Sequence, residues 1–454
     1  MRSCTLVLAL IGTLFAFDRS LAARRGEIIP ETAARRHGLA RPWFTQIQLD
    51  RARARVSHVV LDRGTLFVQT DHAVVHAIDA ETGQTFWAKQ VGRRDHPSLT
   101  PGANKNFVAV INGSFLYVVN RFSGKLLWKT QLEGAPGGGP AMSEQRLYVP
   151  MVDGMVYSYR LEPMKDPLEE LGLIRDPEEL TPEEQEALEE ERRETIRLSQ
   201  EYVPPLACKS FGRALVQPIV THQTQDEEYV AWPTDRGFLF VAHVVRREDH
   251  FTVLYRLETE AGIAAQPAYW PPDPNLIPDE GVIYAASRDG FVHAITERAG
   301  NSLWRFSTAE PILEPPVVIG QSVYVVTQPG GMYCLDAKSG VQKWWTYQVA
   351  QFIAASRERL YVADKLDRIV VLSTASGARL DTIPAPGLDI KLVNTQTDRI
   401  YLATSTGLIQ CLHETELSEP IVHRQPPEPV AEEPAAEEEP EAEEQAAPVD
   451  DPFR

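Results

Sequence analysis

The sequence has few of the residues that build redox, metal or nucleotide sites. Only four of its 454 residues are cysteine, and no two form a C-x-x-C pair, so a zinc or dithiol site has little support. It contains no nucleophile motif, no phosphate-binding loop and no paired carboxylates in a catalytic context. His72 and His76 are four residues apart, but they flank an expected hairpin turn, where the helical spacing of metal ligands does not apply. We therefore expect no catalytic, cofactor-binding or metal-binding residue.

A basic surface for nucleic acid is also lacking. The formal charge is −18, but residues 162–201 carry −10 and residues 414–454 carry −12, so the remainder is close to +4. The acidic charge thus belongs to an insert and a tail, and the rest of the chain is nearly neutral. No basic groove of the kind that binds nucleic acid is expected.

Long apolar runs are missing apart from one near the N-terminus. Arg2 precedes a twelve-residue apolar stretch, residues 6–17, and Ser20-Leu21-Ala22 supplies small residues for cleavage. The stretch is too short to cross a bilayer comfortably, so residues 1–22 are predicted to be a secretory signal, with a short membrane anchor as the alternative. Cys4 precedes the apolar stretch and cannot be a lipid-anchor cysteine. We expect an exported protein with no transmembrane span, periplasmic or associated with the outer membrane.

What the chain does contain is a repeated phrase of strand, glycine turn and tryptophan. It occurs as VHAIDAETGQTFW, LYVVNRFSGKLLW, VHAITERAGNSLW and GGMYCLDAKSGVQKWW. Trp87 and Trp128 are 41 residues apart, and Trp304 and Trp344 are 40 apart. A fixed period of this length indicates a repeat architecture, and four short strands in about forty residues are typical of one propeller blade.

Eight strand pairs follow one another from residue 56 onward. The last pair, residues 400–412, has no tryptophan strand after it, whereas the strand expected at residues 43–49 has no pair before it. Joined, the two would complete one blade and close the ring. We therefore predict an all-β, eight-bladed propeller over residues 43–413; seven blades with a leftover pair would leave strand edges unpaired.

The repeat positions are expected to be structural. Each tryptophan should form a wedge between blades, and each glycine should supply the positive φ of its turn. These positions are Trp43, Trp87, Trp128, Trp304, Trp344, Gly83, Gly124, Gly300, Gly340 and Gly377. The fourth repeat lacks its tryptophan, and the seventh has Leu380 and Asp381 in its place. Cys334 and Cys411 occupy the repeat position of Ala77 and Ala294, as expected of small buried residues.

Three segments lie outside the repeats. Residues 31–39, within an N-terminal segment 23–42, favour a short helix. The acidic insert 162–201 should contain a helix near residues 182–200, because Thr181 is a good N-cap and Pro182 a good first residue; it is either solvated or a docking element. The tail, residues 414–454, is rich in proline, glutamate and alanine and is expected to be disordered.

The phrases DAETGQTFW, DAKSGVQKWW and VYVVTQPGGMYCL resemble the quinoprotein-type, or PQQ-like, repeat. That repeat occurs in pyrroloquinoline-quinone (PQQ) dehydrogenases and in BamB-type outer-membrane assembly propellers, and the resemblance covers about residues 43–413. The enzymes of the family hold the quinone between a tryptophan floor and an adjacent-cysteine disulfide, beside calcium and a catalytic aspartate. This chain has no adjacent cysteines, and Trp232 and Trp270, which lie off the repeat position, have no ligand cluster near them in sequence.

The resemblance therefore implies a non-enzymatic scaffold without a cofactor. It would bind other envelope proteins through the loops of the propeller faces, with a role in outer-membrane protein assembly. Two alternatives are a PQQ-dependent dehydrogenase and an envelope sensor that binds a small ligand in the central channel. The absent lipid-anchor cysteine departs from the BamB type. The sequence sets neither the partner nor the oligomeric state.

Overall fold

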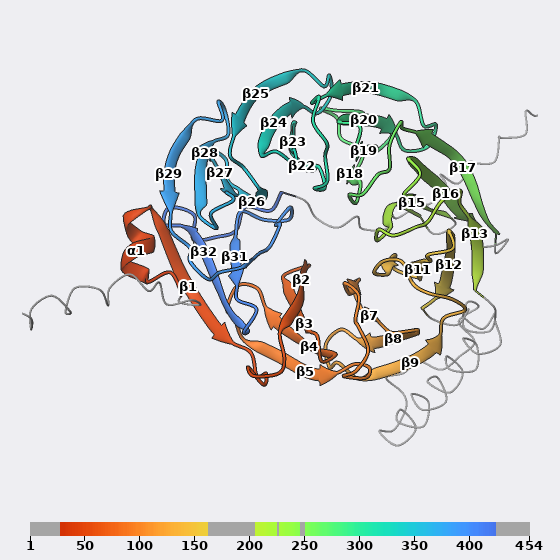
Figure 1. Cartoon of the computed structure of the whole chain (residues 1–454), viewed down its shortest axis with the longest axis horizontal. Coiled ribbons are helices and arrows are strands. Elements are labelled where there is room, and N and C mark those ends of the chain that lie inside the picture. The colour runs from red at the N-terminus through yellow and green to blue at the C-terminus, as the bar shows by residue number, and fades with distance from the viewer. Residues whose placement is uncertain (1–27, 162–204, 225–226, 246–249, 424–454) are drawn as a thin grey trace, which may run out of the picture.

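The computed structural model describes residues 28–161, 205–224, 227–245 and 250–423. These residues form eight four-stranded antiparallel sheets arranged in a ring (Figure 1). The predicted signal, the predicted helix at residues 182–200 and the tail beyond residue 423 lie outside the described residues. The all-β, eight-bladed architecture expected from the repeat is confirmed.

The first four blades follow the chain, each from its innermost to its outermost strand. Blade 1 is β2 (Val56–Asp62), β3 (Thr65–Thr70), β4 (Val74–Asp79) and β5 (Thr85–Gln90). Blade 2 is β6 (Gly102–Ala103), β7 (Phe107–Asn112), β8 (Phe115–Asn120) and β9 (Leu126–Gln131). Blade 3 is β10 (Ala141–Met142), β11 (Arg146–Pro150), β12 (Met155–Arg160) and β13 (Leu206–Lys209). Blade 4 is β14 (Ile219–Gln223), β15 (Glu227–Pro233), β16 (Phe238–Val245) and β17 (His250–Glu258).

The next three blades repeat this order. Blade 5 is β18 (Ala268–Trp270), β19 (Val282–Ala286), β20 (Phe291–Thr296) and β21 (Ser302–Ser307). Blade 6 is β22 (Val317–Ile319), β23 (Ser322–Val326), β24 (Gly331–Asp336) and β25 (Gln342–Tyr347). Blade 7 is β26 (Gln351–Ala355), β27 (Arg359–Ala363), β28 (Ile369–Ser373) and β29 (Arg379–Ile383).

Blade 8 joins the two ends of the described chain. Its three inner strands are β30 (Ile390–Lys391), β31 (Ile400–Ala403) and β32 (Leu408–Glu414), and its outermost strand is the N-terminal β1 (Leu39–Gln46). Strand β1 is antiparallel to β32, with Trp43 opposite Cys411. The N-terminal strand therefore closes the ring, as the two orphan segments of the sequence indicated (Figure 1).

The N-terminal segment contributes more to this blade than the sequence indicated. Strand β1 begins at Leu39, four residues before the expected start, and is preceded by helix α1 (Glu31–Arg36). Leu39 and Ala34 are fully buried, and they pack in one cluster with Ile29 and Leu412. Residues 29–39 therefore belong to the core between blades 7 and 8 rather than to a leading extension.

Candidate functional site

The repeat tryptophans lie between blades. Trp43, Trp87, Trp128, Trp304 and Trp344 are each less than a tenth exposed. Each indole Nε1 donates a hydrogen bond to a backbone carbonyl near the following turn, as from Trp87 to Arg121 O at 2.7 Å and from Trp344 to Thr374 O at 2.8 Å. These indoles are therefore committed to contacts between blades.

The turn glycines receive the ring of the preceding blade. A Cβ atom built on Gly83, Gly124, Gly340 or Gly377 would come within 2.5 Å of the indole of Trp43, Trp87, Trp304 or Trp344, respectively. All four have positive φ between +66° and +73°. Glycine is thus required at each turn for two reasons: its positive φ, and the absence of a Cβ atom where the indole packs.

Gly300 shows what replaces the missing tryptophan of the fourth repeat. Its Cβ would lie 2.5 Å from the ring of Tyr255, whose hydroxyl donates to the carbonyls of Thr296 and Glu297 at 2.8 and 2.7 Å. Tyr255 therefore makes the contact that tryptophan makes elsewhere. Its place in the sheet is that of a repeat tryptophan, because Tyr255 lies opposite Val241 as Trp128 lies opposite Val118.

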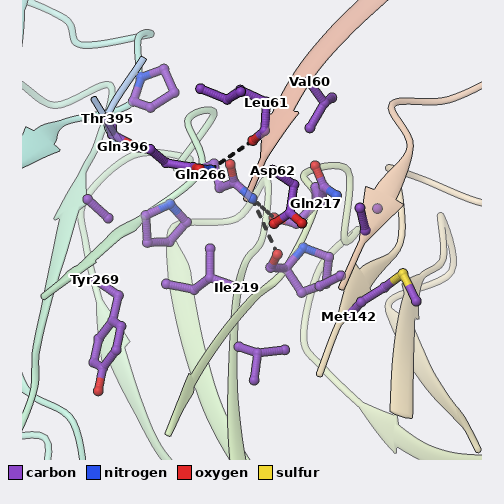
Figure 2. Close-up of a pocket in the computed structure, with 18 of the residues that line it drawn as sticks. Val60, Leu61, Asp62, Met142, Gln217, Ile219, Gln266, Tyr269, Thr395 and Gln396 are labelled. Carbon is purple, nitrogen blue, oxygen red and sulfur yellow. Dashed lines mark hydrogen bonds between the residues drawn. The ribbon is translucent and has the colours of Figure 1, made fainter. Parts of the chain in front are cut away.

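The candidate ligand site is the central channel, a cavity of about 480 Å³. Its wall consists of residues from the innermost strands and the turns beside them, as Figure 2 shows for one part of it. Prolines stand before five of these strands, namely Pro101, Pro140, Pro218, Pro267 and Pro316. Proline has no N–H to offer an incoming strand, so it is suited to an edge that faces the channel. A proline directly before each of these inner strands is the signal by which the sequence marks the channel wall.

Glutamine amides link neighbouring blades along the channel wall. Gln217 Nε2 donates to Pro140 O at 2.7 Å, joining blades 4 and 3, and Gln266 Nε2 donates to Gln217 O at 3.2 Å, joining blades 5 and 4. Gln396 Nε2 donates to Leu61 O at 2.8 Å, across the closure between blades 8 and 1 (Figure 2). These polar side chains therefore already act as structural ties.

Two carboxylates line the channel among the described residues, Asp62 and Glu144, and both are ion-paired. Arg121 pairs with the Asp62 carboxylate and also donates to Asp62 O at 2.6 Å and to Asn104 O at 2.7 Å. Burial raises the pKa of Asp62, and the Arg121 guanidinium opposes that shift. Glu144 Oε1 lies 2.5 Å from Arg63 Nη2. Neither carboxylate is placed as a free base or metal ligand.

The described residues do not fit a calcium–quinone group, which needs an open aromatic plane, a lid and convergent oxygen ligands. Trp232 is fully buried and stacks on Phe240 with ring centroids 5.8 Å apart. Trp270 Nε1 bonds the Asp273 carboxylate at 3.2 Å. Free Cys208, Cys334 and Cys411 are buried in blades 3, 6 and 8. No set of three or more His, Cys, Asp or Glu residues in the described ranges is arranged to hold a metal.

No helix in the described part of the chain is long and apolar enough to cross a membrane.

The family model described as "Outer membrane protein assembly factor BamB" matches residues 71–162 and 272–387. No curated protein sequence matches the chain.

Two solved propellers illustrate the structural similarity. The crystal structure of BamB from Moraxella catarrhalis matches with a TM-score of 0.58 and 10% identity, over 83% of this chain and 98% of that one. The computationally designed Ika8 protein matches with a TM-score of 0.53 and 11% identity, over 80% and 96%. At such identities the similarity establishes the fold, which many functions share.

Proposed function

We propose that this chain, an eight-bladed propeller of the PQQ-like repeat family, is a non-enzymatic scaffold that binds other proteins in the cell envelope. The two channel carboxylates carry this proposal. Asp62 is held by Arg121 and Glu144 by Arg63, so the place where a quinone enzyme of this family works is occupied by contacts between blades. The loops on the two faces of the ring then remain as the surface for partners.

The proposal also includes a specific role in the cell envelope, in the assembly of outer-membrane proteins. The matching family model and the Moraxella catarrhalis structure both carry the name BamB, and the family description specifies outer-membrane protein assembly. The leader-like residues 1–22 agree with export of the chain. We propose that the protein acts on the periplasmic side of the outer membrane.

Deletion of the gene in the source organism tests this role. We expect lower amounts of β-barrel proteins in the outer membrane, restored by the full chain, and we expect envelope proteins to co-purify with the chain after crosslinking in cells. Unchanged barrel levels together with no envelope protein recovered would contradict the scaffold.

A direct assay addresses the enzyme alternative. Calorimetric titration of the full chain with PQQ and Ca²⁺, followed by a dye-linked alcohol oxidation assay, should show neither binding nor turnover. Micromolar binding with turnover would make the protein a dehydrogenase.

A small-ligand sensor is the second candidate, and the channel volume favours it. A cavity of about 480 Å³ lies within the range of roughly 300–1,000 Å³ typical of small-molecule sites. Ligand screening by thermal shift, with Gln266→Leu as the variant that alters the channel wall, distinguishes this candidate. A stabilising ligand whose effect is lost in the variant would favour a sensor over a scaffold.

A further inference from the structure

A row of aromatic side chains crosses from blade 5 to blade 6. It consists of Phe306 of β21 and Tyr333 of β24, which are half-buried, and Trp345 and Tyr347 of β25, which are exposed; it is here called the aromatic cluster. The ring centroids of Phe306 and Tyr333 are 5.6 Å apart, those of Tyr333 and Trp345 6.3 Å, and those of Trp345 and Tyr347 6.3 Å. Trp345 is 48% exposed and Tyr347 57% exposed. Two adjacent rings, Trp345 and Tyr347, are therefore open to solvent, and the half-buried rings of Tyr333 and Phe306 continue the row.

A guanidinium completes the cluster at one end. Arg379, from β29 of blade 7, lies 5.2 Å from the centroid of the Tyr347 ring and donates to Tyr347 O at 2.7 Å. Trp, Tyr and Arg are the residues that most often dominate binding energy at protein interfaces. The composition is that of a recognition surface.

The repeat itself does not call for aromatic residues here. The three residues after the wedge tryptophan are Ala-Lys-Gln in blade 1 and Lys-Thr-Gln in blade 2, but Trp-Thr-Tyr in blade 6. In β25 the burial alternates, so that Trp344 and Thr346 face inward while Trp345 and Tyr347 face outward. Blade 8 has a single exposed ring at this place, Phe44. Trp345 and Tyr347 are thus additions to a surface that is polar in the first two blades.

The chemistry of the cluster selects its ligand. Flat aromatic rings in a row are suited to an extended proline-containing segment, because proline is apolar and already ordered in the polyproline II conformation. The Arg379 guanidinium adds a site for a carboxylate. The ligand should therefore combine prolines with acidic residues.

Residues 424–454 of this chain have that composition, with seven prolines and eleven acidic residues in 31 positions. The segment starts at a defined point, because the backbone N–H of His423 donates to Gln396 O at 2.7 Å and His423 Nε2 lies 2.7 Å from Ala355 O of blade 7. In polyproline II form, 31 residues span about 95 Å, whereas a domain of about 400 residues has a radius of gyration of about 21 Å. The segment is long enough to reach blade 6, which neighbours blade 7.

We propose that residues 424–454 dock on the aromatic cluster of the same molecule, with prolines against Trp345 and Tyr347 and a carboxylate at Arg379. Covalent tethering supports this occupant over a free one, because it supplies the segment at millimolar effective concentration. This inference does not depend on the proposed scaffold function.

Photo-crosslinking in the full chain tests the docking. A benzophenone amino acid replaces Tyr347 or, as the matched control, Gln131, which holds the same place in exposed strand β9 of blade 2. We expect crosslinks from position 347 to peptides within residues 424–454, in monomers, and at most background crosslinking from position 131. Equal crosslinking from both positions, crosslinks only between molecules, or crosslinks only to other segments would overturn the proposal.

A second variant distinguishes the contribution of the Arg379 charge from that of proline stacking on the aromatic rings. With the probe at position 347, Arg379→Gln should lower the crosslink yield by about two- to fivefold at low salt, as expected for a partly exposed ion pair, and added salt should lower the yield of the parent protein similarly. An unchanged thermal unfolding midpoint verifies that the variant is folded. A yield unaffected by both changes would contradict the role of Arg379.

Discussion

The indole of Trp43, in the last blade, lies directly against the α-carbon of Gly83, in the first blade. A Cβ atom at residue 83 would stand 2.5 Å from Trp43 Cε3, and Trp43 Nε1 donates to Ala80 O at 3.0 Å. The junction that closes the ring therefore uses the same contact as the junctions within the repeat, although Trp43 belongs to the N-terminal strand that completes blade 8.

Replacing Gly83 by alanine tests this contact. Gly64 is a matched control, since its φ of +72° is close to the +73° of Gly83 and its Cβ would meet nothing within 4 Å. Both variants bear the backbone strain, so the difference reports the clash with the indole, which we expect to cost about 1–3 kcal/mol more in Gly83→Ala. Denaturant unfolding measures it. Equal losses of stability would contradict the packing of Trp43 on Gly83.

The adjacent residues Trp344 and Trp345 allow a tryptophan buried between blades to be compared with one on the surface. Trp344 is 6% exposed and Trp345 48% exposed. Trp344→Ala should lower the free energy of unfolding by about 3–5 kcal/mol because it leaves a cavity against Gly377. Trp345→Ala, as the internal control, should cost less than about 1.5 kcal/mol, the upper end for an aromatic pair contact. A reversed order in the unfolding midpoints would refute the assignment.

Removal of β1 should open the ring. In a chain that starts at residue 47, the edge of β32 is unpaired, and the buried cluster that contains Leu412 loses Leu39. We expect a lower thermal midpoint and association into larger species, because an open strand edge pairs with other chains. A chain that starts at residue 28 is the control. Monomeric, equally stable protein from both chains, judged by calorimetry and size-exclusion chromatography, would show that closure through β1 is dispensable.

The contact between α1 and blade 7 should depend on pH. His37 Nδ1 lies 2.6 Å from Asp381 Oδ2, and this hydrogen bond lowers the pKa of Asp381. Because the folded pKa is below the unfolded value of about 3.9, the stabilisation is present above that value and is lost as the pH falls through the folded pKa. Asp381→Asn should thus be destabilised relative to the parent at pH 6, and the difference should shrink below about pH 4. Exposed Asp279→Asn is the control, and a difference constant from pH 6 to pH 3 would contradict the prediction.

Several features were accessible from the sequence because they repeat along it. The forty-residue period, the glycine four residues before each tryptophan and the two orphan strands led to eight blades and to the closure of the ring. The start of β1 was placed four residues late, because Leu39 and Ala40 lie before a bulge that shifts the register ahead of Trp43. An irregularity of that kind has no periodic signal.

Other features were not accessible because their meaning depends on a partner in another blade. Tyr255 replaces a tryptophan only when β17 is placed against the turn of Gly300. The channel glutamines look like ordinary polar residues until Gln217 meets Pro140 and Gln266 meets Gln217. Asp381 departs from the repeat, and its partner His37 lies 344 positions away in the chain.

The sequence by itself determined the repeat, the strand alternation and hence the propeller, because those depend on residues within about forty positions of one another. Only the tertiary structure decided the chemistry of the channel and the surface. Gln396 meets Leu61 across 335 positions, and Arg121 reaches Asp62 across 59. Whether a carboxylate is free or paired, and whether an indole is a wedge or an exposed ring, is set by side chains that only the closed ring brings together.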